Sequence, residues 1–149
     1  MNWNTNKSLF LSRLCTAGFA LLLAGMDLGC PWLVRGYVRL RGMTDAAGSA
    51  MIVTLYLGSV FAWPLLWHLW RLLGNLKREE IFTEENVAHL RAVSWCCAGG
   101  ALVCLGGTRW YLPFLVVGLA AAFMSLIVRT VKNVFNQAVA MKSELDLTI

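Results

Sequence analysis

Four long apolar stretches, separated by short polar segments, dominate the chain. They run over about residues 14–33, 48–70, 92–107 and 111–128. An α-helix needs roughly 20 mainly apolar residues to cross the hydrocarbon core of a bilayer. The pattern therefore predicts an all-α integral membrane protein with four transmembrane helices, folded as a single membrane domain over residues 1–149. The third stretch is short, but a helix that begins near Glu84 can run into it.

Prolines and small residues refine this picture. Pro64 falls inside the second stretch, where it should kink the helix, and Pro113 falls in the first turn of the fourth, where proline is tolerated. Gly106 to Arg109 should form a tight hairpin. Pairs of small residues four apart mark possible close helix contacts, and we expect them to pack within the bundle more often than in a dimer. These pairs are Gly25 and Gly29, Gly100 and Cys104, and Gly118 and Ala122.

The first stretch resembles a signal peptide in some respects. Lys7 and Arg13 precede it, and the sequence from Leu28 to Cys30 imitates a lipoprotein cleavage box. However, Asp27 stands where such a box requires an aliphatic residue, and the apolar stretch is long for a signal. We therefore expect a retained membrane anchor.

An amphipathic helix is predicted after the fourth stretch, in a cytoplasmic tail over residues 129–149. Its apolar face would carry Val131, Val134, Phe135, Ala138 and Val139. Its other face would carry Arg129, Lys132, Asn133, Asn136 and Gln137. We expect this helix to end at about Lys142, before an acidic and apolar tail that frays. Three placements remain open: along the membrane surface, against the loop between the second and third spans, or against a partner protein.

The loop between the second and third spans contains a clear helix start. Its sequence is Phe82-Thr83-Glu84-Glu85-Asn86-Val87. The threonine is a good N-cap, the two glutamates oppose the positive helix end, and the phenylalanine can contact the valine. A well-built entry into the third span explains all of this except Asn86 and the exposed face of His89 and Arg91.

Composition and charge support a membrane protein. The chain is 58% hydrophobic and only 14% charged, and its net charge is +5. The basic residues lie beside apolar stretches and form no single patch, so we expect contact with an anionic lipid leaflet and no direct binding of nucleic acid.

The distribution of Lys and Arg predicts the orientation, because these residues are enriched in cytoplasmic segments. One side of the membrane would hold nine: Lys7, Arg13, Arg71, Lys77, Arg78, Arg91, Arg129, Lys132 and Lys142. The other side would hold four: Arg35, Arg39, Arg41 and Arg109. Both termini and the loop over 71–91 should therefore lie in the cytoplasm, in a bacterial cytoplasmic membrane.

Asp27 is the only acidic residue inside a predicted span. A carboxylate there is costly unless it faces a partner or water, so it is a possible proton or cation site. The alternative, which we favour, is an ion pair with Arg35 or Arg109 near the outer interface. His68 is expected to be a lone, satisfied structural histidine and not a proton relay.

The five cysteines show no CxxC motif and no metal-ligand spacing, so neither a metal nor a cofactor is expected. They are Cys15, Cys30, Cys96, Cys97 and Cys104. Cys30 and Cys104 should both lie near the outer face, where a disulfide is possible. A membrane thiol-disulfide oxidoreductase is therefore an alternative, weakened because no CxxC arrangement lowers a thiol pKa.

Two motifs give a family resemblance. The loop motif is Phe82, Thr83, Glu84, Glu85 and Asn86, followed by Leu90-Arg91; the tail motif is Glu144, Asp146, Leu147, Thr148 and Ile149 after Val134-Phe135. In these the chain resembles the bacterial four-helix membrane family known as domain of unknown function 2975, over roughly residues 55–149. Ile81 replaces a usual proline, and Leu145 a common asparagine. The resemblance implies a protein without known catalysis, often encoded beside a small helix-turn-helix regulator.

We therefore expect a non-enzymatic membrane sensor or anchor that binds a small helix-turn-helix DNA-binding protein at its cytoplasmic face. Six acidic residues fall on that face and would suit a basic partner surface: Glu79, Glu80, Glu84, Glu85, Glu144 and Asp146. A small proton- or cation-coupled transporter that uses Asp27 is the alternative from another class, and a homo-oligomer is possible in either case.

Overall fold

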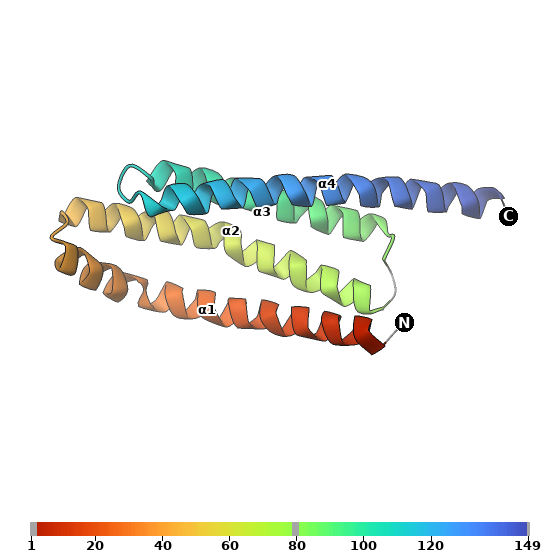
Figure 1. Cartoon of the computed structure of the whole chain (residues 1–149), viewed down its shortest axis with the longest axis horizontal. Coiled ribbons are helices and arrows are strands. Elements are labelled where there is room, and N and C mark those ends of the chain that lie inside the picture. The colour runs from red at the N-terminus through yellow and green to blue at the C-terminus, as the bar shows by residue number, and fades with distance from the viewer. Residues whose placement is uncertain (1–2, 79–80, 149) are drawn as a thin grey trace.

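A computed structural model describes residues 3–78 and 81–148 of the chain (Figure 1). Its helices are α1 (Trp3–Arg41), α2 (Asp45–Lys77), α3 (Glu84–Gly107) and α4 (Pro113–Thr148). All four are long and apolar enough to cross a membrane, and no strand occurs in the described ranges. The prediction of an all-α multi-pass membrane protein is thus confirmed. Glu79, Glu80 and Ile149 lie outside the described residues.

The helices extend beyond the apolar stretches that predicted them. α1 has 39 residues, which corresponds to roughly 58 Å at 1.5 Å per residue, well beyond a hydrocarbon core of about 30 Å. The local sequence explains where helices begin. Thr44 and Thr83 cap α2 and α3, each accepting a hydrogen bond from a backbone N–H three residues later, and Pro113 is the first residue of α4. α2 continues through Pro64, and α1 likewise contains Pro31.

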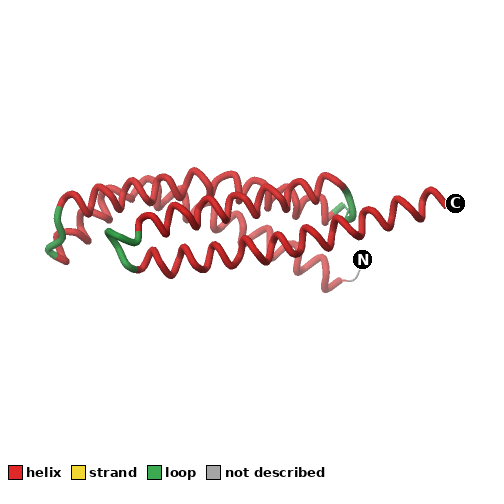
Figure 2. The backbone as a smooth tube through the Cα atoms, turned by 90° about the horizontal axis from the view of Figure 1, so that it is seen from above, coloured by secondary structure: helices red, strands yellow, loops and turns green. Residues whose placement is uncertain are grey.

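The helices form an up-and-down bundle. α3 lies between α2 and α4, and α1 lies along α2. Figure 2 shows the α1–α2 and α3–α4 connections at one end and the α2–α3 connection at the other. Both termini lie at the end that carries the α2–α3 connection, and α4 extends beyond the rest of the bundle there (Figure 1). We call this the terminal end, and the other the hairpin end.

A small apolar core lies toward the hairpin end. It brings Cys30, Val34 and Val38 of α1 together with Met51 of α2 and Phe114 of α4. Tyr37 and Tyr111 pack edge-to-face beside it, with ring centroids 5.7 Å apart. These contacts fasten α1 to the bundle at the hairpin end.

Glycines show where helices approach closely. A Cβ on Gly118 would lie 2.9 Å from Leu105 Cγ, and one on Gly99 would lie 2.4 Å from the Phe61 ring. The prediction of packing within the bundle fits Gly118 but is wrong for Gly25 and Gly29. A Cβ on Gly25 would meet nothing within 4 Å, and one on Gly29 only a side chain of its own helix. Asp27, which lies between them in the sequence, hydrogen-bonds to α2, so the two glycines lie on another face of α1 and serve no close approach to α2.

Candidate functional site

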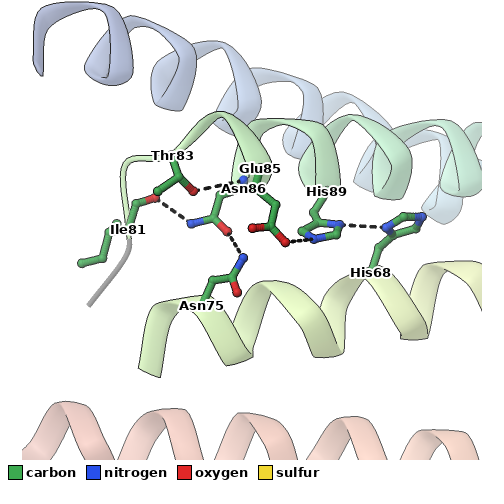
Figure 3. Close-up of polar contacts among 7 residues, drawn as sticks. All are labelled: His68, Asn75, Ile81, Thr83, Glu85, Asn86 and His89. Carbon is green, nitrogen blue, oxygen red and sulfur yellow. Dashed lines mark hydrogen bonds and ion pairs between the residues drawn. The ribbon is translucent and has the colours of Figure 1, made fainter. Parts of the chain in front are cut away.

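The loop motif is organised around Asn86, whose side chain is fully buried (0% exposed). Its Nδ2 donates to the carbonyl oxygen of Ile81 at 2.8 Å, and its Oδ1 accepts from Asn75 Nδ2 at 2.9 Å (Figure 3). Its backbone N–H donates to the hydroxyl of Thr83 at 3.3 Å. Asn86 therefore joins the end of α2, the connection and the start of α3, which accounts for the one loop residue that helix capping left unexplained.

A second series of polar contacts lies beside Asn86 and leads from the surface toward the bundle. Glu85 Oε1 lies 3.4 Å from His89 Nε2, and His89 Nδ1 lies 2.9 Å from His68 Nδ1 (Figure 3). One Nδ1 must donate and the other accept, so the two rings cannot both be fully protonated in this geometry. The side chain of Glu85 is 58% exposed and that of His89 only 14%. This series of polar contacts therefore connects the solvent-accessible carboxylate of Glu85 to His68 of α2.

His68 is satisfied, as expected, but it is not alone, because its Nδ1 lies 2.9 Å from His89 Nδ1. A signal for the pair existed in the sequence. Antiparallel helices with a short connection bring residues on either side of it to similar levels. His68 lies nine residues before the end of α2, and His89 lies five residues after the start of α3. The pattern within either helix alone does not reveal the contact between the two histidines.

The other loop-motif residues lie on the surface. The Phe82 ring lies 5.7 Å from the ring of Phe135 on α4, whereas Glu84 and Arg91 are exposed. The structure thus divides the predicted loop site: Thr83 and Asn86 build the connection, Phe82 contacts α4, and the charged residues are available at the surface.

The described part of the tail motif, Glu144 to Thr148, is helical and exposed. α4 continues through Thr148, beyond the predicted end at Lys142, and residues 140–148 are all exposed. Of the three placements considered for the amphipathic helix, packing against the loop is seen at Phe135, whose ring contacts the ring of Phe82. Glu144 lies nine residues beyond Phe135, about 14 Å further along the helix. The structure therefore does not bring the tail motif to the loop motif.

Asp27 forms hydrogen bonds with α2 and no ion pair. Its Oδ1 accepts from Ser59 Oγ at 2.5 Å, and its Oδ2 accepts from Trp63 Nε1 at 3.0 Å. Among the described residues, no Arg or Lys forms an ion pair with it, so the predicted pairing with Arg35 or Arg109 is wrong. Two turns of helix separate Asp27 from the level of Arg35, about 12 Å, which places the carboxylate inside the apolar stretch.

A cavity of about 220 Å³ adjoins Asp27. Its polar lining comes from Asp27, Thr54 and Ser59, and the thiols of Cys30 and Cys104 also face it. All five cysteines are free, so the disulfide considered for Cys30 and Cys104 is not formed. No group of three or more His, Cys, Asp or Glu residues that could hold a metal occurs in the part of the chain that the structure describes.

A further polar contact joins α3 and α4 and was not predicted. Ser94 Oγ donates to the carbonyl oxygen of Ser125 at 3.1 Å, and Ser125 Oγ donates to that of Ser94 at 2.8 Å. Reciprocal bonds of this kind need two backbones at close range, which residue type alone does not reveal. They fasten the pair of helices that carries the exposed tail.

Comparison with known proteins gives one match. No curated protein and no solved structure matches the sequence. The model of a family described as protein of unknown function (DUF2975) matches residues 16–149. The match begins in the first span and so extends further than the resemblance over residues 55–149 that the two motifs indicated. The chain therefore belongs to the DUF2975 family.

Proposed function

We propose that this protein is a non-enzymatic anchor or sensor in a bacterial cytoplasmic membrane, and that it binds a small helix-turn-helix DNA-binding protein through the end of α4. We call residues 136–148 the α4 arm. The observation that carries the proposal is that this arm is helical and extends beyond the bundle (Figure 1), with residues 136, 137 and 140–148 exposed.

Apolar residues of the arm, together with Val134 just before it, form a stripe that suits a helical partner. Val134, Ala138, Met141 and Leu145 follow one another at spacings of four, three and four residues, so they share one helix face. Val134, Met141 and Leu145 are 59%, 58% and 67% exposed. An apolar helix face without cover is typical of a protein interaction site.

The charges at the tip of the arm favour a basic partner. Glu144 and Asp146 are exposed beside the stripe, and complementary charge increases the rate and specificity of association. A DNA-binding surface is basic because it contacts phosphates. A regulator held by these carboxylates would be kept from its DNA, and its release would be the output of the sensor.

The test removes the tip of the arm and then changes single residues. Deletion of residues 143–149 should release the co-expressed regulator from the membrane fraction, while the protein stays inserted because insertion depends on the apolar spans. Leu145→Ser should weaken retention, whereas Leu145→Met, which keeps an apolar side chain, should preserve it. Reversing the charge of Glu144 and Asp146 should weaken it in part. A regulator that never co-fractionates with the intact protein refutes the proposal; retention after deletion moves the site to the loop near Thr83.

A small proton- or cation-coupled transporter is a second candidate, and the position of Asp27 favours it. An ionisable side chain within a span, beside a cavity and without a cationic partner among the described residues, is typical of ion pathways. The hydroxyl of Ser59 and the indole of Trp63 would stabilise the charged carboxylate. The adjoining cavity would admit the solute.

A further inference from the structure

A basic pocket lies between α1 and α2 near the terminal end, and it shares Asn75 with the loop site above. Its volume is about 470 Å³. It is lined by Arg13 of α1 and by Trp70, Arg71, Gly74, Asn75, Lys77 and Arg78. Four of these seven residues are cations, and none of the described lining residues carries a carboxylate. The pocket is therefore suited to an anion.

Arg13 is held in place within this pocket. Its guanidinium lies over the Trp70 ring, with 4.9 Å between Cζ and the ring centroid. Gly74 lies directly beside it, since a Cβ there would be in ordinary contact with Arg13 Nη2 at 3.5 Å. Stacking on an aromatic ring leaves the guanidinium edge available for hydrogen bonds to an oxyanion.

One donor of Arg13 has no partner. Its Nε is buried and forms no hydrogen bond. A buried donor without an acceptor is rare, because it loses its bond to water and gains none in return. Because Nε has no accessible surface, a phosphate would be bound by the terminal nitrogens of the guanidinium, which can hold its oxygens in a bidentate manner.

An apolar groove continues from the basic pocket toward the middle of the bundle. Its volume is about 770 Å³, and Trp70 lines both spaces. The groove is lined by Thr16, Ala17 and Ala20 of α1 and by Trp63, Trp67 and Trp70 of α2, together with further apolar side chains. The only hydroxyl among these side chains, on Thr16, already donates to the carbonyl oxygen of Ser12 at 2.8 Å. The groove thus offers an apolar surface.

We propose that the pocket and groove together bind one phospholipid with an anionic headgroup from the adjacent leaflet. The basic pocket is followed by the apolar groove, just as the charged headgroup of such a lipid is followed by its acyl chains. Its phosphate would lie among Arg13, Arg71 and Arg78, near the membrane surface, and an acyl chain would lie along Ala17, Ala20 and Trp67. Basic pockets between helices near a membrane surface are suited to anionic headgroups. A soluble anion would use only the pocket and leave the groove empty.

The test measures lipid binding to the full chain, purified and delipidated in a neutral detergent, by native mass spectrometry. Phosphatidylglycerol and phosphatidylcholine with identical acyl chains are titrated separately. Both lipids carry the phosphate, but the choline ammonium of phosphatidylcholine would lie among the four cations of the pocket, whereas phosphatidylglycerol has no such group. Repulsion between like charges at contact distance is enough for phosphatidylglycerol to bind at least roughly tenfold more tightly. Equal binding of the two lipids would overturn the proposal.

Variants locate the site. Arg13→Gln and Arg71→Gln should each remove most of the preference for phosphatidylglycerol. Arg129→Gln is the matched control, since Arg129 lies over Trp95 at 5.9 Å but does not line the pocket. A control that loses as much preference as Arg13→Gln would contradict the assignment. Circular dichroism shows whether each variant folds. If Arg13→Gln does not fold, the comparison of Arg71→Gln with the wild-type protein decides whether the basic pocket binds the lipid.

A final variant separates a lipid from a free phosphate. Ala20→Phe should fill the groove and weaken phosphatidylglycerol binding severalfold, while leaving any binding of soluble glycerol phosphate unchanged. If glycerol phosphate binds wild-type protein as tightly as phosphatidylglycerol does, the ligand is a soluble anion and the lipid assignment is wrong.

Discussion

Asn86 shows how one buried amide can hold a helix connection. Replacing it with Ala would leave the Ile81 carbonyl and the Asn75 amide without their partner at a part-buried site. We expect Asn86→Ala to cost about 1–3 kcal/mol, the usual penalty for a buried polar group left unpaired. A lowered midpoint of thermal unfolding in detergent would show this. Asn133→Ala, on the exposed surface of α4, is the control, and an equal effect in both variants would argue against the anchoring role.

Asp27 allows a direct test of the transport alternative. Asn has nearly the shape of Asp but cannot release a proton, so Asp27→Asn should abolish proton-coupled efflux while the protein remains inserted. The measurement is the efflux of a lipophilic cationic dye from energised cells, with Asp45→Asn, an exposed residue at the start of α2, as control. Efflux that continues unchanged in the Asp27 variant would exclude this function.

At this scale the sequence allows some assignments and not others. The Thr83 cap was predictable because it depends only on neighbours within one turn. The roles of Asn86, of the His68 and His89 pair, and of Asp27 depend on which residues of another helix lie opposite, and this register is a tertiary property. Side-chain bonds between helices are therefore the part of the candidate sites that sequence reasoning misses.

At the scale of the helix, glycine positions separate close contacts from open faces. Gly118→Ala would place a methyl group 2.9 Å from Leu105 Cγ and 3.1 Å from the Leu105 backbone nitrogen. Overpacking of this kind typically costs about 1–3 kcal/mol, so the thermal midpoint should fall. Gly25→Ala is the control, because its new methyl group would lie in open space. Both variants gain the same helix propensity. Equal midpoints in the two variants would show that α3 and α4 are packed less closely than the structure indicates.

The four helices were predictable because apolar stretches of membrane-spanning length leave the backbone no other way to satisfy its hydrogen bonds in lipid. The helix ends were less predictable. The continuation of α4 to Thr148 was missed because acidic residues near a helix C-terminus oppose the helix dipole, which favours fraying. In the structure the terminal turns still hold, and Thr148 Oγ1 donates to the carbonyl oxygen of Glu144 at 2.6 Å.

For the whole molecule, the asymmetry of Lys and Arg predicts that the terminal end faces the cytoplasm. Reporter fusions after Ile149 and within residues 74–80 should then both give a cytoplasmic signal. The structure places the α2–α3 connection and the C-terminal part of α4 at the same end (Figure 1), so the two fusions should agree. An external signal from either would refute the orientation.

The continuity of α4 has a mechanical consequence. After Gly118 the helix contains neither Gly nor Pro up to Thr148, so it has no obvious hinge between its membrane segment and the arm. Transmembrane helices change tilt when bilayer thickness changes, and a stiff helix transmits that rotation along its length. An arm of about 20 Å would move its tip by roughly 3–4 Å for a tilt change of about 10°. The arm would then act as a lever, and a protein bound to it would be displaced by a change in the bilayer that it never touches.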